Sequence, residues 1–159
     1  EDIYAWMSVP DVRPLVETHR AFQADNLALS VSFEGSAAAL EALRDAGLKL
    51  AAVTSRSRRT SLLTLERAGL ASYFDAIVSA EDGGGLKPDP APLRHALALL
   101  GRDTAGAAMV GDSPHDIAAG KALGLLTVGA IYGFHQSSVV DAQPDRIIAH
   151  ISELPAALQ

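Results

Sequence analysis

The 159-residue sequence contains no cysteine, so it supports neither a disulfide framework nor a thiol-based site. It has no apolar run long enough to span a bilayer and no signal-peptide pattern. It also has no internal repeat and no low-complexity tract. These absences favour a globular protein of the cytoplasm that does not contact a membrane.

Positive charge is scarce as well. The formal net charge is −6 and the sequence pI is about 5.2, which argues against nucleic acid as a partner. The glycines at 83–85 lack the spacing of a P-loop or a dinucleotide fingerprint. A chain of this length is the size of one domain and long enough to bury a real core.

Apolar runs alternate with helical patterns along most of the chain. The expected helices cover residues 10–29, 36–46, 60–68, 91–100, 114–123 and 152–158, and the expected strands cover 48–54, 76–79, 107–110, 126–131 and 146–149. Strands that alternate with helices predict a parallel, helix-covered sheet. The nearly continuous apolar runs suit strands buried on both faces. We therefore predict an α/β fold, a Rossmann-like parallel sheet with helices on both faces.

The most informative segment is Met109–Asp116. It predicts a buried strand that ends in a glycine turn, with Asp112 directly after the turn and Asp116 four residues later. The carboxyl ends of parallel strands are where open α/β sheets bind ligands. Mg²⁺ usually takes one or two carboxylates together with substrate phosphate. The alternative is structural, because aspartate is also a favoured helix N-cap.

Two other segments place polar groups after strands. Thr54, Ser55 and Arg56 follow the apolar run that ends at Val53, just before a predicted helix. A hydroxyl and free backbone N–H groups at a helix start form a natural phosphate seat. Lys87 lies in a glycine-rich loop before another helix, where a single lysine is ordinarily a solvated surface charge.

The order of these motifs resembles the haloacid-dehalogenase-like hydrolase superfamily. The resemblance is carried by residues 53–58, 86–93, 110–124 and 128–135. The sequences of these segments are similar to those of its phosphoglycolate phosphatase and pyrophosphatase subgroup. It implies that Thr54, Lys87 and Asp112 are catalytic. It further implies that Thr54, Ser55, Arg56 and Lys87 bind substrate. Asp112 and Asp116 would be the Mg²⁺ ligands, with Asp116 orienting metal-bound water or Lys87.

The first motif of that superfamily is a strand ending in Asp-x-Asp, and we find none here. Asp2, Asp11 and Asp25 follow no apolar strand and have no partner aspartate two residues on. We therefore expect residues 1–31 to be a remnant of a helical cap and residues 32–159 to be a catalytic core without its first strand. The strands ending at Val53 and Val110 would then have a gap or a borrowed strand between them, which invites strand exchange or homo-oligomerisation.

The resemblance implies a Mg²⁺-dependent phosphatase of a small phosphorylated metabolite such as phosphoglycolate. It would act through an aspartyl-phosphate whose nucleophile is absent from this chain. One alternative is a pyrophosphatase or phosphomutase of the same superfamily. Another is a truncated, non-catalytic interaction module.

Overall fold

The computed structural model describes residues 11–25, 30–82, 84–134 and 136–159. The chain divides into two compact units, Glu1–Val31 and Ser32–Gln159. The described part of the first unit contains helix α1 (Arg13–Asp25), and Asp11 Oδ1 accepts a hydrogen bond from the Arg13 backbone N–H at 3.0 Å. Residues 10 and 26–29 of the helix predicted here lie outside the described residues. The assignment of this unit as a cap remnant stays a prediction.

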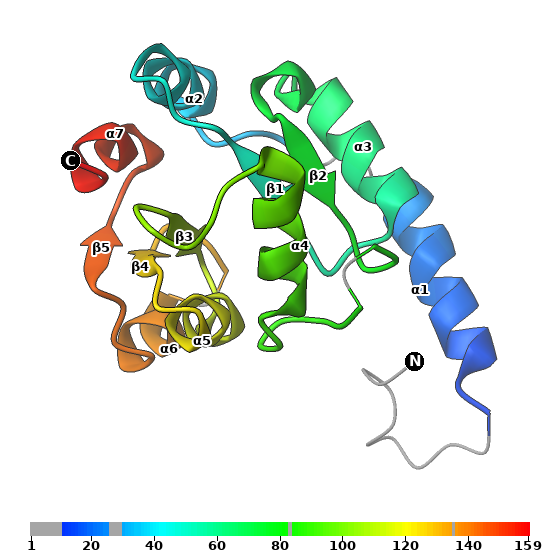
Figure 1. The fold of residues 1–159 in the computed structure, drawn as a ribbon. Helices are drawn as coiled ribbons and strands as arrows, with labels where there is room; N and C mark the ends of the chain where they lie inside the picture. Colours follow the sequence, from blue (N-terminus) through cyan, green and yellow to red (C-terminus); the bar gives the residue numbers. More distant parts are fainter. Residues whose placement is uncertain (1–10, 26–29, 83, 135) are drawn as a thin grey trace. The chain divides into compact units, whose positions relative to one another are not determined.

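The second unit is built from parallel strands and helices, so the predicted α/β fold is confirmed (Figure 1). Its strands are β1 (Ala51–Val53), β2 (Ala76–Val78), β3 (Ala108–Gly111), β4 (Leu126–Ala130) and β5 (Arg146–Ile148). Its helices are α2 (Ser36–Asp45), α3 (Arg58–Arg67), α4 (Ala91–Leu100), α5 (Pro114–Ala122), α6 (Gln136–Asp141) and α7 (Leu154–Ala157), with 3-10 helices at Ala71–Tyr73 and Ile151–Glu153.

The strands form two separate sheets. β1 pairs with β2, with Ala52 opposite Ile77, and β4 lies between β3 and β5, with Val128 opposite both Val110 and Arg146. All three pairings are parallel. No strand pairs with the free edge of β1 or of β3 within the described residues. Among the described residues β1 and β3 are therefore not neighbours in one sheet, as the predicted gap between the strands of Val53 and Val110 requires; that the core lacks its first strand stays a prediction.

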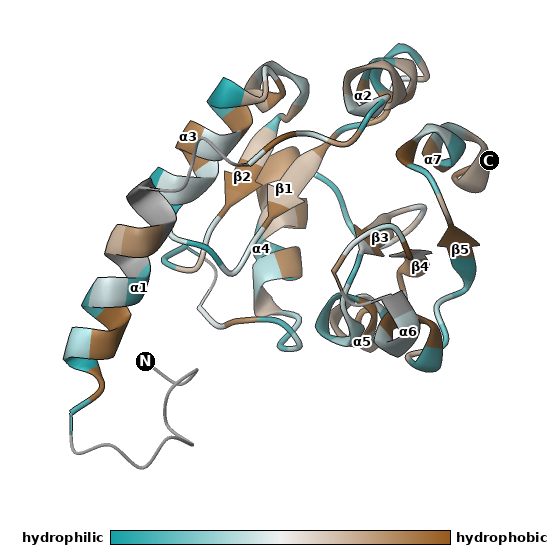
Figure 2. Cartoon of the chain, turned by 180° about the vertical axis from the view of Figure 1, so that it is seen from behind, coloured by the Kyte–Doolittle hydropathy of each residue, from teal (hydrophilic) through white to brown (hydrophobic). Residues whose placement is uncertain are grey.

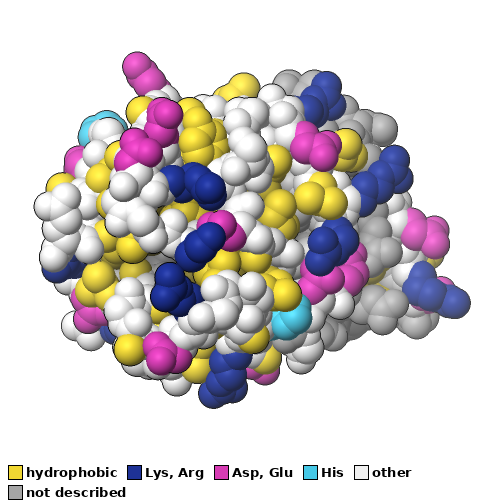
Figure 3. Space-filling model, turned by 45° about the horizontal axis from the view of Figure 1, so that its top comes forward, with side chains coloured by type: hydrophobic (Ala, Val, Ile, Leu, Met, Phe, Trp, Pro, Cys, Tyr) yellow, Lys and Arg dark blue, Asp and Glu magenta, His cyan; other side chains and the backbone are white. Residues whose placement is uncertain are grey.

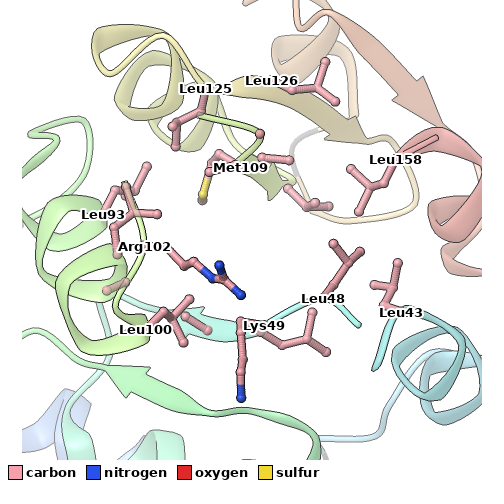
Figure 4. A pocket seen from close by; sticks show the side chains of 18 of the residues that line it. Leu43, Leu48, Lys49, Leu93, Leu100, Arg102, Met109, Leu125, Leu126 and Leu158 are labelled. Atoms are coloured by element: carbon pink, nitrogen blue, oxygen red, sulfur yellow. The ribbon is translucent and has the colours of Figure 1, made fainter. Parts of the chain in front are cut away.

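A cavity of about 1000 Å³ lies between these two free edges. Its lining includes Ala51–Thr54 from the β1 side and Ala107–Val110 from the β3 side. Figure 4 shows leucines from helices α2 and α4, from β4 and from connecting segments around this space, together with the Met109 side chain. All three residues of β1 are only partly buried, although they are apolar. A strand with neighbours on both sides would bury them more completely.

The buried side chains form two apolar clusters, one on each side of β3. One cluster is centred on Leu43, Val128 and Ile148, and the other on Leu93, Met109 and Leu125. Figure 2 shows hydrophobic residues on both sheets. One surface, seen in Figure 3, instead has acidic and basic side chains interspersed with apolar ones. No described helix is long and apolar enough to cross a membrane.

The differences from the sequence-based expectation include three helical segments. Helix α3 begins at Arg58, not Thr60, because Ser57 caps it by accepting from the Thr60 backbone N–H. Helix α6 follows β4 where only a loop was expected. The last predicted helix, 152–158, is divided into a 3-10 turn and the short α7, with Pro155 near the start of α7.

Candidate functional site

Lys87 brings two segments of the second unit together. Its Nζ donates to the Val53 carbonyl oxygen, at the end of β1, at 2.8 Å. The same ammonium lies 2.6 Å from Asp116 Oδ1 on α5, and the two side chains are only 13% and 7% exposed. Lys87 is therefore not the solvated charge that a lone lysine in a glycine-rich loop ordinarily is. It joins the carboxyl end of β1 to the first turn of α5.

Asp116 is held by the helix that carries it. Ser113 is the N-cap of α5, and it forms a capping box in which Asp116 Oδ2 accepts from the Ser113 N–H at 3.1 Å and from its hydroxyl at 2.8 Å. A Cβ on Gly111 would overlap the Asp116 side chain, so glycine is required there. Both Asp116 oxygens thus have protein partners. The role of Asp116 as a metal ligand stays a prediction. Its contacts favour the alternative role, in which Asp116 orients Lys87.

Asp112 is not the helix cap, because Ser113 fills that position. Its Oδ2 accepts a hydrogen bond from the Phe134 backbone N–H at 3.0 Å. No donor reaches its Oδ1 within the described part of the chain. Tyr132 lies close by: burial, followed by the negative charges of Asp112 and Glu153, raises the pKa of its phenol to about 12. The tyrosine therefore stays protonated around neutral pH.

Thr54 sits at the end of β1, next to the carbonyl that Lys87 contacts. Its backbone N–H donates to the Val78 carbonyl at 2.9 Å, which fixes it to β2. Its Oγ1 accepts from the Arg56 backbone N–H at 3.1 Å, so the hydroxyl proton remains available to a phosphate oxygen. Ser55 and Arg56 are exposed beside it.

The start of α3 is less open than expected. The Arg58 backbone N–H donates to Glu81 Oε2 at 2.8 Å, and the Thr60 N–H is capped by Ser57. The Arg58 guanidinium lies 2.6 Å from Asp82 and, together with Ser79, holds the pKa of Asp82 well below its usual range. The expectation of free helix-start N–H groups is wrong for Arg58 and Thr60. A phosphate seat here depends on Thr54 and the turn after it.

The structure therefore joins Lys87, Asp116 and the end of β1 through direct contacts. Asp112 lies on the same turn as Ser113, but no hydrogen bond among the described residues links it to Lys87 or to Thr54. Sequence reasoning missed Gly133 and Phe134, which contact Asp112. The only signal that pointed to them was the family-like segment 128–135 in which they lie.

The donor atoms suit a hard cation only in part. No group of three His, Cys, Asp or Glu residues that could enclose a metal is found among the described residues. Mg²⁺ does not need such a group, because it is usually bound by one or two carboxylates with waters and substrate phosphate. Asp112 is half-buried, and its Oδ1 accepts from no donor among the described residues, which fits that pattern. Asp112 is the residue here that would hold Mg²⁺.

Parallel strands covered by helices define an α/β protein of the kind that binds ligands at the carboxyl ends of its strands. The profile of the haloacid dehalogenase-like hydrolase family matches residues 4–130. The chain belongs to this family, which confirms the resemblance inferred from its motifs.

Two named relatives within this family are similar in sequence to the chain. The phosphoglycolate phosphatase of Neisseria gonorrhoeae is 38% identical over 126 residues, which is 77% of this chain and 53% of that protein. The pyrophosphatase PpaX of Bacillus velezensis is 34% identical over 142 residues, or 88% of this chain and 66% of that protein. This chain thus spans between about half and two thirds of the length of these relatives.

A solved structure agrees with the fold. The crystal structure of CbbY from Rhodobacter sphaeroides in complex with phosphate has a TM-score of 0.77 and 27% identity. The match covers 92% of this chain and 68% of that one.

Proposed function

We propose that this chain is the larger part of the core of a cytoplasmic, Mg²⁺-dependent phosphatase that hydrolyses a small phosphorylated metabolite of the phosphoglycolate kind. The observation that carries the proposal is the position of the Lys87 ammonium. It contacts the Val53 carbonyl at the carboxyl end of β1 and lies 2.6 Å from Asp116 of α5. A largely buried cation at that edge is suited to a phosphoryl group, because catalysis of phosphoryl transfer is mainly positioning and charge stabilisation. Relatives named phosphoglycolate phosphatase support the substrate class.

In the proposed reaction the chain's own residues bind and orient the phosphoryl group. The Thr54 hydroxyl donates a hydrogen bond to a phosphoryl oxygen. The exposed Ser55 and Arg56 line the same turn. Lys87 balances the negative charge of the phosphoryl group and of the attacking carboxylate. When bound, Mg²⁺ supplies further neutralisation of the phosphoryl charge. Asp112 offers Oδ1 to this cation, and Asp116 keeps Lys87 in place.

The nucleophile of this proposal is an aspartate that forms an aspartyl-phosphate, which water then hydrolyses. No described aspartate follows β1 or β3 in an Asp-x-Asp arrangement. The free edges of β1 and β3 and the cavity between them leave room for a strand that would carry it. A protein that contains this chain together with such a strand is therefore the proposed active species.

The test compares three substrates and matched variants of the protein that contains this chain. Phosphoglycolate, pyrophosphate and a generic aryl phosphate are offered with and without Mg²⁺. Asp112→Asn should remove most of the Mg²⁺-dependent hydrolysis, Asp116→Asn should cost less, and Asp141→Asn on an exposed face of α6 should leave turnover unchanged. Unchanged turnover in Asp112→Asn would refute the proposed metal-binding role.

A pyrophosphatase is the second candidate, because relatives named PpaX cover up to 98% of this chain. Preferential hydrolysis of pyrophosphate in the same assay would favour it. No hydrolysis of any of the three substrates would favour a non-catalytic interaction module instead.

A further inference from the structure

The loop that follows β4 lies against Asp112. A Cβ added to Gly133 would overlap the Asp112 side chain, with Asp112 Cγ only 2.7 Å from it. The next residue, Phe134, donates its backbone N–H to Asp112 Oδ2 at 3.0 Å. The loop thus both makes room for this carboxylate and fixes one of its two oxygens.

This loop is itself anchored, so it is able to hold a neighbour in place. The Ile131 N–H donates to the Ile148 carbonyl of β5 at 3.0 Å, and the Gly133 N–H reaches the Ala130 carbonyl at 3.4 Å. Tyr132 packs against the apolar cluster around Val128 and meets Phe33 in an edge-to-face contact, with ring centroids 4.8 Å apart. These contacts fix the loop independently of Asp112, so the loop is able to hold the Asp112 carboxylate in place.

The contact also distinguishes the two carboxylate oxygens. Oδ2 is occupied by the Phe134 N–H, whereas Oδ1 has no donor among the described residues. Hydrogen bonds that fix a ligating side chain orient it and support metal affinity. We propose that Gly133 and the Phe134 backbone N–H are positioning residues for Asp112, and that they present Oδ1 to a divalent cation. This inference rests on the proposed function, in which Asp112 binds that cation.

If Gly133 had a purely structural role, its replacement would lower the melting temperature without changing cation binding. Gly129, on β4, offers a matched control, since a Cβ there would lie 2.8 Å from Pro144 Cγ and its three nearest atoms would belong to Pro144 and Val139. Gly133→Ala and Gly129→Ala should both lower the melting temperature because both crowd a tight contact. Only Gly133→Ala should also affect the cation site.

The experiment uses Mn²⁺ as a paramagnetic probe and follows line broadening in amide NMR spectra of the protein. Gly133→Ala should weaken Mn²⁺ binding about 10-fold or more, the usual scale for loss of a supporting contact. Gly129→Ala should bind like the wild type, and Asp112→Asn should lose binding. Wild-type affinity in Gly133→Ala, with binding lost in Asp112→Asn, would overturn this inference while leaving the metal role of Asp112 intact.

A second readout needs no metal. The Phe134 amide should exchange with solvent distinctly faster in Asp112→Ala than in the wild type, because its acceptor is gone. If its exchange is unchanged, Phe134 does not hold Asp112 and the inference fails. If the wild type binds no Mn²⁺ at Asp112, the proposed metal site fails, and the role of Phe134 in presenting Oδ1 to a cation fails with it.

Discussion

Lys87 and Asp116 form a largely buried ion pair in which Nζ lies 2.6 Å from Oδ1. The pair is not isolated, because Lys87 also donates to the Val53 carbonyl and Asp116 also accepts from Ser113. Val53 is the last residue of β1, whose outer edge is open. The Lys87 ammonium therefore provides a hydrogen-bond partner for the Val53 carbonyl at the end of that edge. One side chain thus contributes both to the candidate site and to the local integrity of β1.

Removal of either charge of this pair should destabilise the protein. Lys87→Met leaves Asp116 buried and only partly compensated, and Asp116→Asn leaves the Lys87 ammonium without its counter-charge. Each change should cost about 3 kcal/mol, the usual scale for breaking a buried pair. The double variant should lose less than the sum of the two, which urea unfolding of all four proteins would measure.

The exposed pair of Lys49 with Asp75 provides the control. Its lysine side chain is 50% exposed, so Lys49→Met should have a much smaller effect. Strictly additive losses in the Lys87 and Asp116 variants would show that the pair is not energetically coupled in solution.

Most of the fold could be predicted from the sequence because its signals are local. Helix α4 begins and ends at the predicted residues, Ala91 and Leu100, since Pro90 precedes it and Gly101 adopts φ of 63° after it. Helix α6 was missed because Gln136–Asp141 is short and its polar and apolar residues show no clear helical period. The regular part of β1 is shorter than the predicted 48–54, as it has a partner on one side only.

The candidate site could be predicted only in part. Strand ends gave Thr54, Lys87 and Asp112 as candidates, because polar groups after apolar runs are visible in the sequence. The contact of Phe134 with Asp112 was not visible, since it uses a backbone N–H that any residue would offer. The occupied amides of Arg58 and Thr60 depend on Glu81 and Ser57, and only the folded chain shows these partners.

Thr127 and Asp145 provide a prediction about pH. The Thr127 side chain is fully buried, and its hydroxyl and N–H donate to Asp145 Oδ2 at 2.7 Å and 2.8 Å. These hydrogen bonds, the hydroxyl's first, hold the pKa of Asp145 below its ordinary value of 3.8. Thr127→Val removes the hydroxyl that donates to Asp145 Oδ2 and accepts from the Asp145 N–H, so it should lower the unfolding free energy at neutral pH.

The sign of the pH effect follows from the lowered pKa. Ionised Asp145 stabilises the folded state fully above its ordinary pKa, and this contribution is lost as pH falls through the lower folded-state value. The difference between wild type and Thr127→Val should therefore be constant near neutral pH and shrink in acid. Thermal unfolding across this range would test it, with Thr104→Val on an exposed loop as the control. A difference that grows in acid would contradict the assignment.

The open edges of β1 and β3 should be visible in amide hydrogen exchange. The Thr54 N–H donates to Val78 of β2, so by the alternation of a parallel strand the Val53 N–H points toward the cavity. Similarly, the Ala107 carbonyl accepts from Leu126 of β4, which turns the Val110 N–H toward the same cavity. Both amides should exchange markedly faster than those of Thr54 and Ile131, which have backbone partners.

The same measurement at two protein concentrations tests whether another copy pairs with these edges. Unpaired strand edges attract further strands, and strand exchange or homo-oligomerisation is our proposal for this chain. Slower exchange of Val53 and Val110 at the higher concentration, with Thr54 unchanged, would support it. Slow exchange of both valines at every concentration would instead mean that a strand already fills the gap. Fast exchange at both concentrations would leave the edges open and rule out pairing between copies in that range.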